Sequence, residues 1–366
     1  MWIVIAGGSM AGLFAAALLR KAGHDVQVHE RSRAGLEGRG AGLVAQQEVF
    51  DLLHRIGRDE VARLGVVARE RITLARDGSI ASAGGPPQMQ ISWDHLYVAT
   101  RMQIPDEAYH LGRGAIAAGQ DADGAWLELD DGERIHADLV IGADGIGSAV
   151  RRSMLPDDAG PRYTGYVAWR ALVPEALLPV SAADVLSDRF AFFHMPGGQA
   201  LGYTVTGANG ELTPGQRRYN AVWYRTTPDL AATLTNVDGR VHPYSLPPGT
   251  VRPNAAREVV TSARSLLPWP FADVFAAEPQ PFVQAIFDME TPRMAAGRLA
   301  LIGDAAFVAR PHTAMGVAKA AGDAMALAHA VNRGWTSEAR GVFEAERLGT
   351  GRAIVDYGRR LGASLG

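Results

Sequence analysis

The chain lacks cysteine, a marked excess of either charge and any long apolar run. Without cysteine, its 366 residues cannot form a disulfide framework, a thiolate metal site or a cysteine nucleophile. No metal is expected at its site. Because 36 basic side chains stand against 39 acidic ones, the net charge of −3 creates no field that attracts nucleic acid or an anionic membrane. We therefore expect neither of these as a partner.

The apolar runs are too short or too interrupted to cross a bilayer, which requires about 20 residues. The N-terminal run 2–6 has no basic segment before it and is shorter than the apolar region of a signal peptide. The alanine-rich stretch 314–331 contains Lys319 and Asp323, so it predicts a packed helix. Together these features predict a cytoplasmic protein.

The first thirty residues show the pattern of a strand, a glycine-rich turn, a helix and a second strand. The turn consists of Gly7, Gly8, Ser9, Met10, Ala11 and Gly12. Glycines allow the backbone to approach a pyrophosphate at the helix N-terminus, and Glu30 lies 18 positions after Gly12, where an acid contacts a ribose. Arg31 can lie over an adenine. This predicts a dinucleotide-binding unit, although Ser9 replaces a usual glycine. The alternative is a glycine-rich turn of an unrelated α/β protein.

Two later segments are buried-strand patterns that end in an acidic residue. The run 139–143 leads into Asp144, and the run 299–302 leads into Gly303 and Asp304. Open α/β sheets bind ligands at the carboxyl ends of their strands. An aspartate there can accept hydrogen bonds from ribityl hydroxyls, and the amides that open a helix suit the electron-rich edge of a flavin. The cofactor residues expected in these segments are Asp144, Gly303, Asp304, Pro311, Gly316 and Val317.

These motifs, in this order and spacing, resemble the single-component FAD-dependent aromatic hydroxylases, the para-hydroxybenzoate hydroxylase class. The resemblance covers nearly the whole chain. It implies an α/β fold in which a Rossmann-like FAD-binding domain is interleaved with a mostly antiparallel β-sheet substrate domain and followed by C-terminal helices. It also implies that Arg39 contacts the FAD pyrophosphate and that Gln46 lies along the cofactor. A solvated surface position is the alternative for both residues.

The expected FAD-binding domain is discontinuous. It comprises residues 1–70, 98–162 and 283–335. The substrate domain comprises residues 71–97 and 163–282, and the C-terminal helices comprise residues 336–366. Alternating apolar residues predict strands at 190–194, 201–205 and 219–224, in a sheet with one face toward the flavin. After residue 337 we expect two helices, the first over 339–347 and the second ending near Gly362.

The chemistry implied by the resemblance is hydroxylation of an electron-rich aromatic or heteroaromatic ring, of the hydroxypyridine or phenol type. NADH or NADPH reduces the bound FAD, and O2 then gives a C4a-hydroperoxide that transfers oxygen to the ring. The sequence has no second dinucleotide-binding unit, so we expect NAD(P)H to dock transiently. The choice between NADH and NADPH and the formation of a homodimer stay open.

Four residues are candidates for catalysis: His312, Tyr203, His194 and Tyr224. A histidine near its ordinary pKa of about 6.5 accepts a substrate proton at neutral pH. A tyrosine can donate to a phenolate or relay a proton. For each of the four, the alternative is an ordinary core or strand residue.

Alternation in one strand places Tyr166 and Arg170 on one face and Trp169 on the other. Arg170 either binds a substrate anion or forms a structural ion pair, the second being the favoured interpretation.

Two other classes of function remain as alternatives. An FAD-dependent oxidase, dehydrogenase or halogenase would keep the cofactor, but the halogenase motif W-x-W-x-I-P is absent. A non-catalytic flavin-binding module would show no substrate-dependent NAD(P)H consumption.

Overall fold

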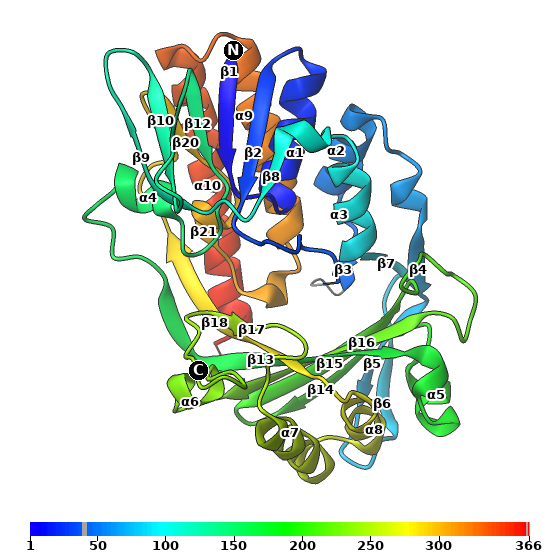
Figure 1. Cartoon of the computed structure of the whole chain (residues 1–366). Coiled ribbons are helices and arrows are strands. Elements are labelled where there is room, and N and C mark those ends of the chain that lie inside the picture. Colours follow the sequence, from blue (N-terminus) through cyan, green and yellow to red (C-terminus); the bar gives the residue numbers. More distant parts are fainter. Residues whose placement is uncertain (39–41, 364, 366) are drawn as a thin grey trace.

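The computed structural model describes residues 1–38, 42–363 and 365, so Arg39 lies outside the described residues. Two layers make up the molecule (Figure 1). One is a mainly parallel sheet with long helices packed against it, and the other is a broad, mainly antiparallel sheet with helices on its outer face. This arrangement confirms the α/β architecture predicted from the sequence.

The first sheet has the strand order β19-β20-β12-β1-β2-β8. Its strands are β1 (Trp2–Ala6), β2 (Asp25–Glu30), β8 (Tyr109–Leu111), β12 (Leu139–Gly142), β19 (Ala295–Ala296) and β20 (Leu299–Leu301). Strand β1 pairs in parallel with both β2 and β12, while β19 is an antiparallel edge. Helix α1 (Met10–Lys21) connects β1 to β2 and packs against α9 (Gly316–Asn332). Ile3, Val4 and Ile5 are fully buried, as expected for a strand covered on both faces.

The second sheet has the order β17-β18-β13-β16-β15-β14-β5-β6, and β21 pairs with β18. Its strands are β5 (Glu70–Leu74), β6 (Ile80–Gly84), β13 (Arg162–Pro174), β14 (Arg189–Met195), β15 (Gly198–Val205), β16 (Arg218–Thr226), β17 (Ser245–Leu246), β18 (Phe282–Glu290) and β21 (Phe307–Val308). The predicted strands at 190–194, 201–205 and 219–224 are therefore confirmed. The predicted alternation of Tyr166 and Trp169 is confirmed as well. Trp169 packs on the outer face of the sheet, which helices cover, and Tyr166 packs on the opposite, inner face.

Three helices cover the outer face of this sheet, namely α5 (Val180–Leu186), α7 (Pro253–Leu266) and α8 (Trp269–Ala277). The outer core joins Trp169 and Trp223 of the strands to Phe271 and Phe275 of α8. With the outer face filled in this way, the inner face is turned toward the parallel-sheet layer.

Smaller elements complete the described chain. Two further sheets contain β3 (Gly42–Val44), β4 (Gly65–Ala68) and β7 (Gln88–Ser92), and β9 (Ala115–Gln120), β10 (Ala125–Leu129) and β11 (Arg134–Ala137). Apart from the C-terminal helix described below, the remaining α-helices are α2 (Gln47–Ile56), α3 (Trp93–Arg101), α4 (Ala149–Met154) and α6 (Leu230–Thr233). Short 3-10 turns are η1 (Val61–Arg63), η2 (Asp106–Ala108), η3 (Glu175–Leu177), η4 (Gly303–Ala305) and η5 (Pro311–Thr313).

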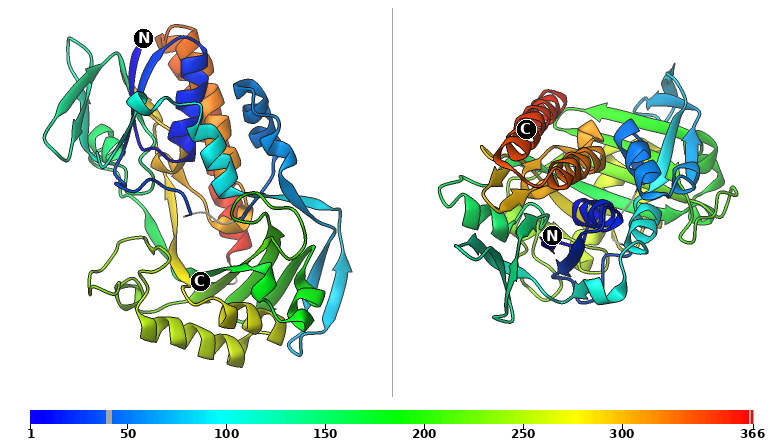
Figure 2. Two further views of the ribbon diagram at one scale, coloured as in Figure 1. Left: turned by 45° about the vertical axis from the view of Figure 1, so that its right-hand side comes forward. Right: turned by 90° about the horizontal axis from the view of Figure 1, so that it is seen from above.

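The C-terminal region differs from the expectation of two helices. One continuous helix, α10 (Ser337–Leu361), runs beside α9 and reaches β18 (Figure 2). The predicted break after residue 347 was wrong, and Gly351 within the continuous helix allows a close approach between chain segments. A Cβ atom at Gly351 would lie 2.5 Å from the Phe307 ring. Tertiary packing thus outweighs the unfavourable helix propensity of glycine, about 1 kcal/mol.

Two other sequence expectations can be compared with the fold. Helix α9 confirms the packed helix predicted from the alanine-rich stretch, and it buries Lys319 and Asp323 almost completely. Strand β18 belongs to the antiparallel sheet, so residues 283–290 lie with that layer and not with the FAD-binding segments as expected. In the described ranges, no helix has both the length and the apolar character to span a membrane.

Candidate active site

The three glycine-containing motifs meet at the N-terminus of α1. Gly7 has φ +101°, and a Cβ atom there would lie 2.3 Å from the carbonyl oxygen of Ala143. A Cβ atom at Gly303 would lie 2.6 Å from Cβ of Ala11. Segments around residues 7, 143 and 303 therefore touch one another, as one shared cofactor site requires.

The glycine-rich turn leaves the start of α1 open to a ligand. Gly12 admits no side chain, because its Cβ atom would lie 1.9 Å from the carbonyl oxygen of Gly7. Ser9 is the N-cap residue in an extended conformation, and its hydroxyl makes no capping hydrogen bond. The first amides of α1 and this hydroxyl are the donors that a phosphate needs.

Glu30 is fixed at the end of β2 beside the same turn. Its two carboxylate oxygens accept hydrogen bonds from the backbone N–H groups of Gly8 at 2.9 Å and Ser32 at 2.8 Å. The residue is 5% exposed. Each oxygen keeps a second lone pair, so Glu30 can also accept from a ribose hydroxyl.

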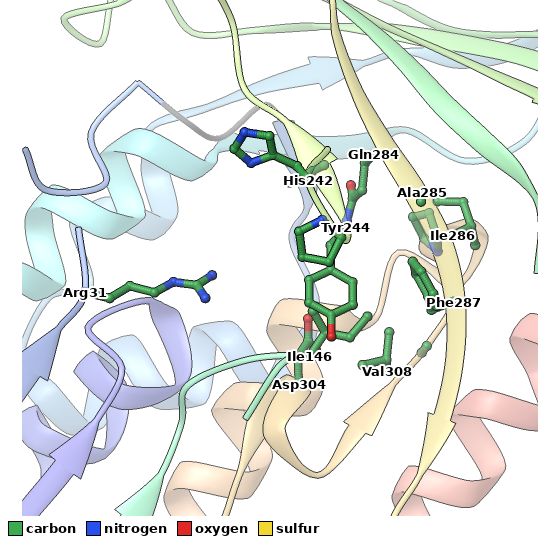
Figure 3. A pocket seen from close by; sticks show the side chains of 14 residues that line it. Arg31, Ile146, His242, Tyr244, Gln284, Ala285, Ile286, Phe287, Asp304 and Val308 are labelled. Carbon is green, nitrogen blue, oxygen red and sulfur yellow. The ribbon is translucent and has the colours of Figure 1, made fainter. Parts of the chain in front are cut away.

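A cavity of about 310 Å³ lies between the two layers. Arg31 extends into it from the β2 side, Tyr244 and β18 line the opposite wall, and Asp304 lies at its lower edge in Figure 3. The Asp304 side chain is 56% exposed to this space. The surrounding protein atoms nevertheless displace much of the water that would hydrate the Asp304 carboxylate, and this desolvation raises its pKa. The positive charge of Lys319 opposes the rise. Arg31 and Asp304 thus supply a cation and an acceptor to one cavity. Their sequence neighbours Glu30 and Gly303 contact the turn and helix at the open N-terminus of α1, and these residues together fit FAD.

Asp144 uses its carboxylate within the chain. It accepts hydrogen bonds from the Ser148 hydroxyl and from the N–H groups of Ala149 at 2.6 Å and Val150 at 3.4 Å, at the start of α4. Burial raises its pKa, and these hydrogen bonds oppose the rise. Asp144 therefore supports the strand end that packs on Gly7, and its expected contact with the cofactor stays a prediction.

The loop before α9 presents a second open helix terminus. The N-cap residue of α9, Met315, makes no side-chain capping hydrogen bond, so Gly316 and Val317 begin the helix without a side-chain partner. The Gln46 amide donates a hydrogen bond of 2.8 Å to the carbonyl of Ala314, which has φ +53°. Gln46 thus holds this loop in place. Pro311, at the start of the same loop, lines the cavity.

Two of the catalytic candidates, Tyr224 and His312, form a cluster with Tyr166 at the inner face of the antiparallel sheet. The rings of Tyr224 and His312 are 4.0 Å apart between centroids. Nε2 of His312 lies 3.0 Å from the hydroxyl of Tyr166. The Tyr224 hydroxyl makes no hydrogen bond with any described residue, although Tyr224 as a whole is only 2% exposed. The structure thus brings His312 and Tyr224 together and adds Tyr166, for which the sequence assigned only the face of its strand.

A chain of hydrogen bonds orients His312. Arg310 forms two hydrogen bonds of 2.9 Å with the carboxylate of Asp288 and donates one of 3.4 Å to Tyr166. Because the Tyr166 oxygen accepts from Arg310, its own proton is available for donation to Nε2 of His312. In the tautomer that accepts this proton, the His312 proton lies on Nδ1. Sequence reasoning missed Arg310 and Asp288, although Arg310 lies only two positions before His312.

The charge state of His312 differs from the expectation. Burial, and then the positive charge of Arg310, lower its pKa to about 4. The premise of a histidine titrating near 6.5 was therefore wrong for this residue, which is neutral at pH 7. It can donate from Nδ1 but does not hold a second proton, on Nε2, at neutral pH.

The other two catalytic candidates lie apart from this cluster. The Tyr203 hydroxyl donates a hydrogen bond of 2.8 Å to the carbonyl of Gly42, and burial raises its pKa to about 12. His194 is exposed at the end of β14, where Nδ1 lies 3.2 Å from the Gln199 amide. Both side chains already have protein partners, and their catalytic roles stay predictions.

Arg170 shares the inner face with Tyr203 and Tyr224 and lowers the pKa of both against the larger effect of burial. The structural ion pair favoured for Arg170 is absent: its guanidinium makes no ion pair or hydrogen bond with any residue that the structure describes. Asn220, diagonally across from it on β16, is fully buried. The Asn220 amide lies near the Tyr203 hydroxyl, which it influences electrostatically, but lacks hydrogen-bond geometry to any described residue.

Comparison with known proteins identifies the family. The FAD binding domain-like model matches residues 163–288, and the FAD binding domain model matches residues 249–357. The 2,6-dihydroxypyridine 3-monooxygenase of Paenarthrobacter nicotinovorans is 32% identical over 99% of this chain and 91% of its own length. The chain belongs to the single-component FAD-dependent aromatic hydroxylases. It is an FAD-dependent monooxygenase that uses NAD(P)H and O2, as the resemblance implied, and the oxidase and non-catalytic alternatives find no support.

Other hydroxylases show the same likeness. The 3-amino-4-hydroxybenzoate 2-monooxygenase of Streptomyces cremeus is 30% identical over 98% of this chain and 86% of its own length. The solved structure of 2,6-dihydroxypyridine-3-hydroxylase from Arthrobacter nicotinovorans has a TM-score of 0.91 at 31% identity, covering 99% of this chain and 92% of its own. Residues 163–170 and 310–320 resemble that enzyme. Klebsiella pneumoniae HpxO, complexed with FAD and uric acid, shares the fold, with a TM-score of 0.78 at 23% identity and coverage of 100% and 89%.

Proposed function

We propose that this FAD-dependent hydroxylase acts on a hydroxylated heteroaromatic ring of the hydroxypyridine type, held between the flavin and the inner face of the antiparallel sheet. The observation that carries the proposal is the contact between Tyr224 and His312 of the loop before α9, whose tilted rings have centroids 4.0 Å apart. The named activity of the 2,6-dihydroxypyridine 3-monooxygenase supports the choice of ring.

The side chains of this cluster suit a ring that carries hydroxyl groups. The Tyr224 hydroxyl, which no described residue engages, and Nδ1–H of neutral His312 can donate hydrogen bonds to a ring oxygen. Arg170 lies on the same inner face without an ion pair to any residue that the structure describes, and it favours an ionised substrate, whose ring carbons are more nucleophilic than those of the neutral form. Tyr203 and His194 are proposed to border the ring at greater distance.

The cofactor lies along the boundary between the layers in this proposal. When bound, FAD accepts electrons from NAD(P)H and activates O2, chemistry that the protein side chains do not supply. The chain binds its phosphates at α1, its ribose at Glu30, its adenine at Arg31 and its ribityl chain at Asp304. Gly316 and Val317 then present their amides to the flavin. The segments 1–70, 98–162 and 291–335 form the FAD-binding domain.

A substrate screen tests the proposal. Purified protein is incubated with NADH or NADPH, ¹⁸O2 and either 2,6-dihydroxypyridine or pyridine, and the product mass is measured. We expect dihydroxypyridine alone to stimulate NAD(P)H oxidation and to acquire one ¹⁸O atom. Hydrogen peroxide as the sole oxygen product from a broad panel of hydroxypyridines and phenols would contradict the proposed function. The same screen decides between NADH and NADPH.

We also propose that the protein acts in the cytoplasm, without nucleic acid or membrane as a partner. The net charge of −3 supports this, because it provides no attraction for polyanions. A homodimer is compatible with the family, and light scattering of the purified protein measures the oligomeric state.

A further inference from the structure

The chain contains only two lysines, Lys21 and Lys319, among its 36 basic residues. Lys21 is exposed at the end of α1, where its ammonium donates a hydrogen bond of 2.7 Å to the carbonyl of Arg55. Lys319 lies in the first turn of α9, and only 1% of its side chain is exposed. A lysine is unusual at so buried a position unless it has a partner.

The ammonium of Lys319 lies between two carboxylates. Nζ is 3.7 Å from Oδ1 of Asp304 and 3.7 Å from Oδ2 of Asp323. Both separations allow an ion pair but exceed hydrogen-bond length, and Nζ has no hydrogen bond with any described residue. Burying a cation is costly unless nearby charge compensates for the lost water. Lys319 therefore depends on these two acids.

Asp323 already has other partners. Its Oδ2 accepts a hydrogen bond of 3.0 Å from the N–H of Gly303, and its Oδ1 accepts one of 2.7 Å from Nε of Arg347. It is 1% exposed. With Arg347 compensating Asp323, the charge of Lys319 is available to Asp304.

Asp304 has no such second partner. Lys319 is the cation in ion-pair contact with it among the described residues, and its carboxylate opens into the cavity. The charged and titratable groups around it are Lys319 and Asp323 on α9, Arg347 on α10 beyond Asp323, and Arg31, His242 and Tyr244 along the cavity. Poor solvation and Asp323 raise the pKa of Asp304, and Lys319 lowers it. Loss of the ammonium would leave the Asp304 carboxylate without a cation in ion-pair contact among the described residues, beside the carboxylate of Asp323.

We propose that Lys319 is a positioning residue for the cofactor: its ammonium keeps the Asp304 carboxylate ionised and fixed at the cavity, where it accepts hydrogen bonds from the ribityl hydroxyls of FAD. This inference rests on the assignment of Asp304 to FAD within the proposed function. The affinity of the protein for FAD then depends on Lys319, a side chain that FAD itself does not touch.

The dissociation constant of FAD tests the proposal. Full-length protein freed of flavin is titrated with FAD at pH 8 and pH 6, and flavin fluorescence is recorded. We expect Lys319→Met, which keeps the length of the side chain, to weaken FAD binding about tenfold at pH 8. The loss grows at pH 6, because Asp304 without the ammonium takes up a proton more readily. Wild-type protein and the control Lys21→Met change little. Equal affinity and equal pH dependence for Lys319→Met and wild type would overturn the proposal.

A double-mutant cycle with Asp304→Asn separates this role from a purely structural one. If Lys319 acts through Asp304, Lys319→Met changes FAD affinity less than about twofold in the Asp304→Asn background. A loss that stays tenfold in that background contradicts the proposal.

Wild-type protein provides a test that does not depend on the folding of a variant. With ¹³Cε-lysine labelling, the two lysines give two NMR signals. FAD should shift the Lys319 signal and leave that of Lys21 in place, and an unmoved Lys319 signal would overturn the inference. A protein that passes these tests but hydroxylates no ring contradicts only the proposed substrate chemistry. A protein that binds no FAD contradicts both.

Discussion

Replacing Tyr166 with phenylalanine would test the hydrogen-bond chain that orients His312. The change removes one hydroxyl from a fully buried ring and leaves the ring volume nearly unchanged. It deletes the 3.0 Å contact with His312 and the longer 3.4 Å contact with Arg310. Arg310 keeps both hydrogen bonds to Asp288, whereas Nε2 of His312 loses the hydroxyl group with which it is paired. Leaving one buried nitrogen unpaired predicts a loss of about 2 kcal/mol in the free energy of unfolding.

The functional consequence of Tyr166→Phe follows from the freed imidazole. Without Tyr166, His312 can exchange its tautomer and rotate, so its Nδ1–H no longer holds a fixed position toward the ring. We expect FAD content to stay at the wild-type level, while a larger share of NAD(P)H oxidation yields H2O2 instead of hydroxylated product. Urea unfolding and the ratio of product to NAD(P)H measure the two effects. Tyr163→Phe is the control, because its hydroxyl donates to the carbonyl of Thr227. Wild-type stability together with wild-type coupling in Tyr166→Phe would refute the hydrogen-bond chain.

Three further predictions address charge, pH and packing. Arg170→Met should weaken the binding of benzoate about tenfold relative to the binding of benzamide, as measured by flavin-absorbance titrations. The control Arg225→Met removes a guanidinium that lies over the outward-facing Trp223, and it should leave this ratio unchanged. Equal affinities of the wild-type protein for benzoate and benzamide would refute the anion site. Burial lowers the pKa of His29 to about 4 in the folded protein, so the stability that its neutral form contributes is complete above about pH 6.5. About 3 kcal/mol of the free energy of unfolding is lost as the pH falls from 6.5 through 4. Urea titrations of wild type and His29→Gln should differ in this window. In α10, Gly351→Ala should lower the unfolding midpoint by collision with Phe307, while Gly349→Ala, with no atom within 4 Å of its Cβ, should raise it.

The cofactor half of the site could be predicted because its signals are local. Glycines at 7 and 12, an acid at 30 and a strand ending in Asp304 keep their spacing along the chain whatever the distant residues do. The structure shows why the spacing matters, since Gly7 packs on Ala143. A local pattern cannot show how a carboxylate is used. Asp144 and Asp304 both follow buried strands, yet only Asp304 opens into the cavity.

The substrate half depends on contacts between strands that are far apart in sequence. Tyr166 and His312 are separated by 146 positions, and their hydrogen bond exists because β13 lies against the loop before α9. Tyr203 and Gly42 are 161 positions apart, and that contact engages the hydroxyl that the sequence suggested for catalysis. Alternation along a strand predicts which face a side chain occupies but not the partner it meets there.

The two halves of the site also differ in which atoms perform the binding, and this difference has a consequence for specificity. Around α1 and α9 the donors are mainly backbone amides at helix termini, and substitution of side chains on the antiparallel sheet does not alter them. The inner face of that sheet contributes side chains alone, among them Tyr224 and Arg170. Substitutions at these strand positions can therefore change the ring that is hydroxylated while FAD binding persists. Glu30 and Asp304 are side-chain exceptions on the cofactor side, and Lys319 is a further one, because its ammonium lies in ion-pair contact with Asp304. Variation at position 319 should accordingly be constrained by cofactor affinity, whereas variation at position 170 should be constrained by the charge of the substrate.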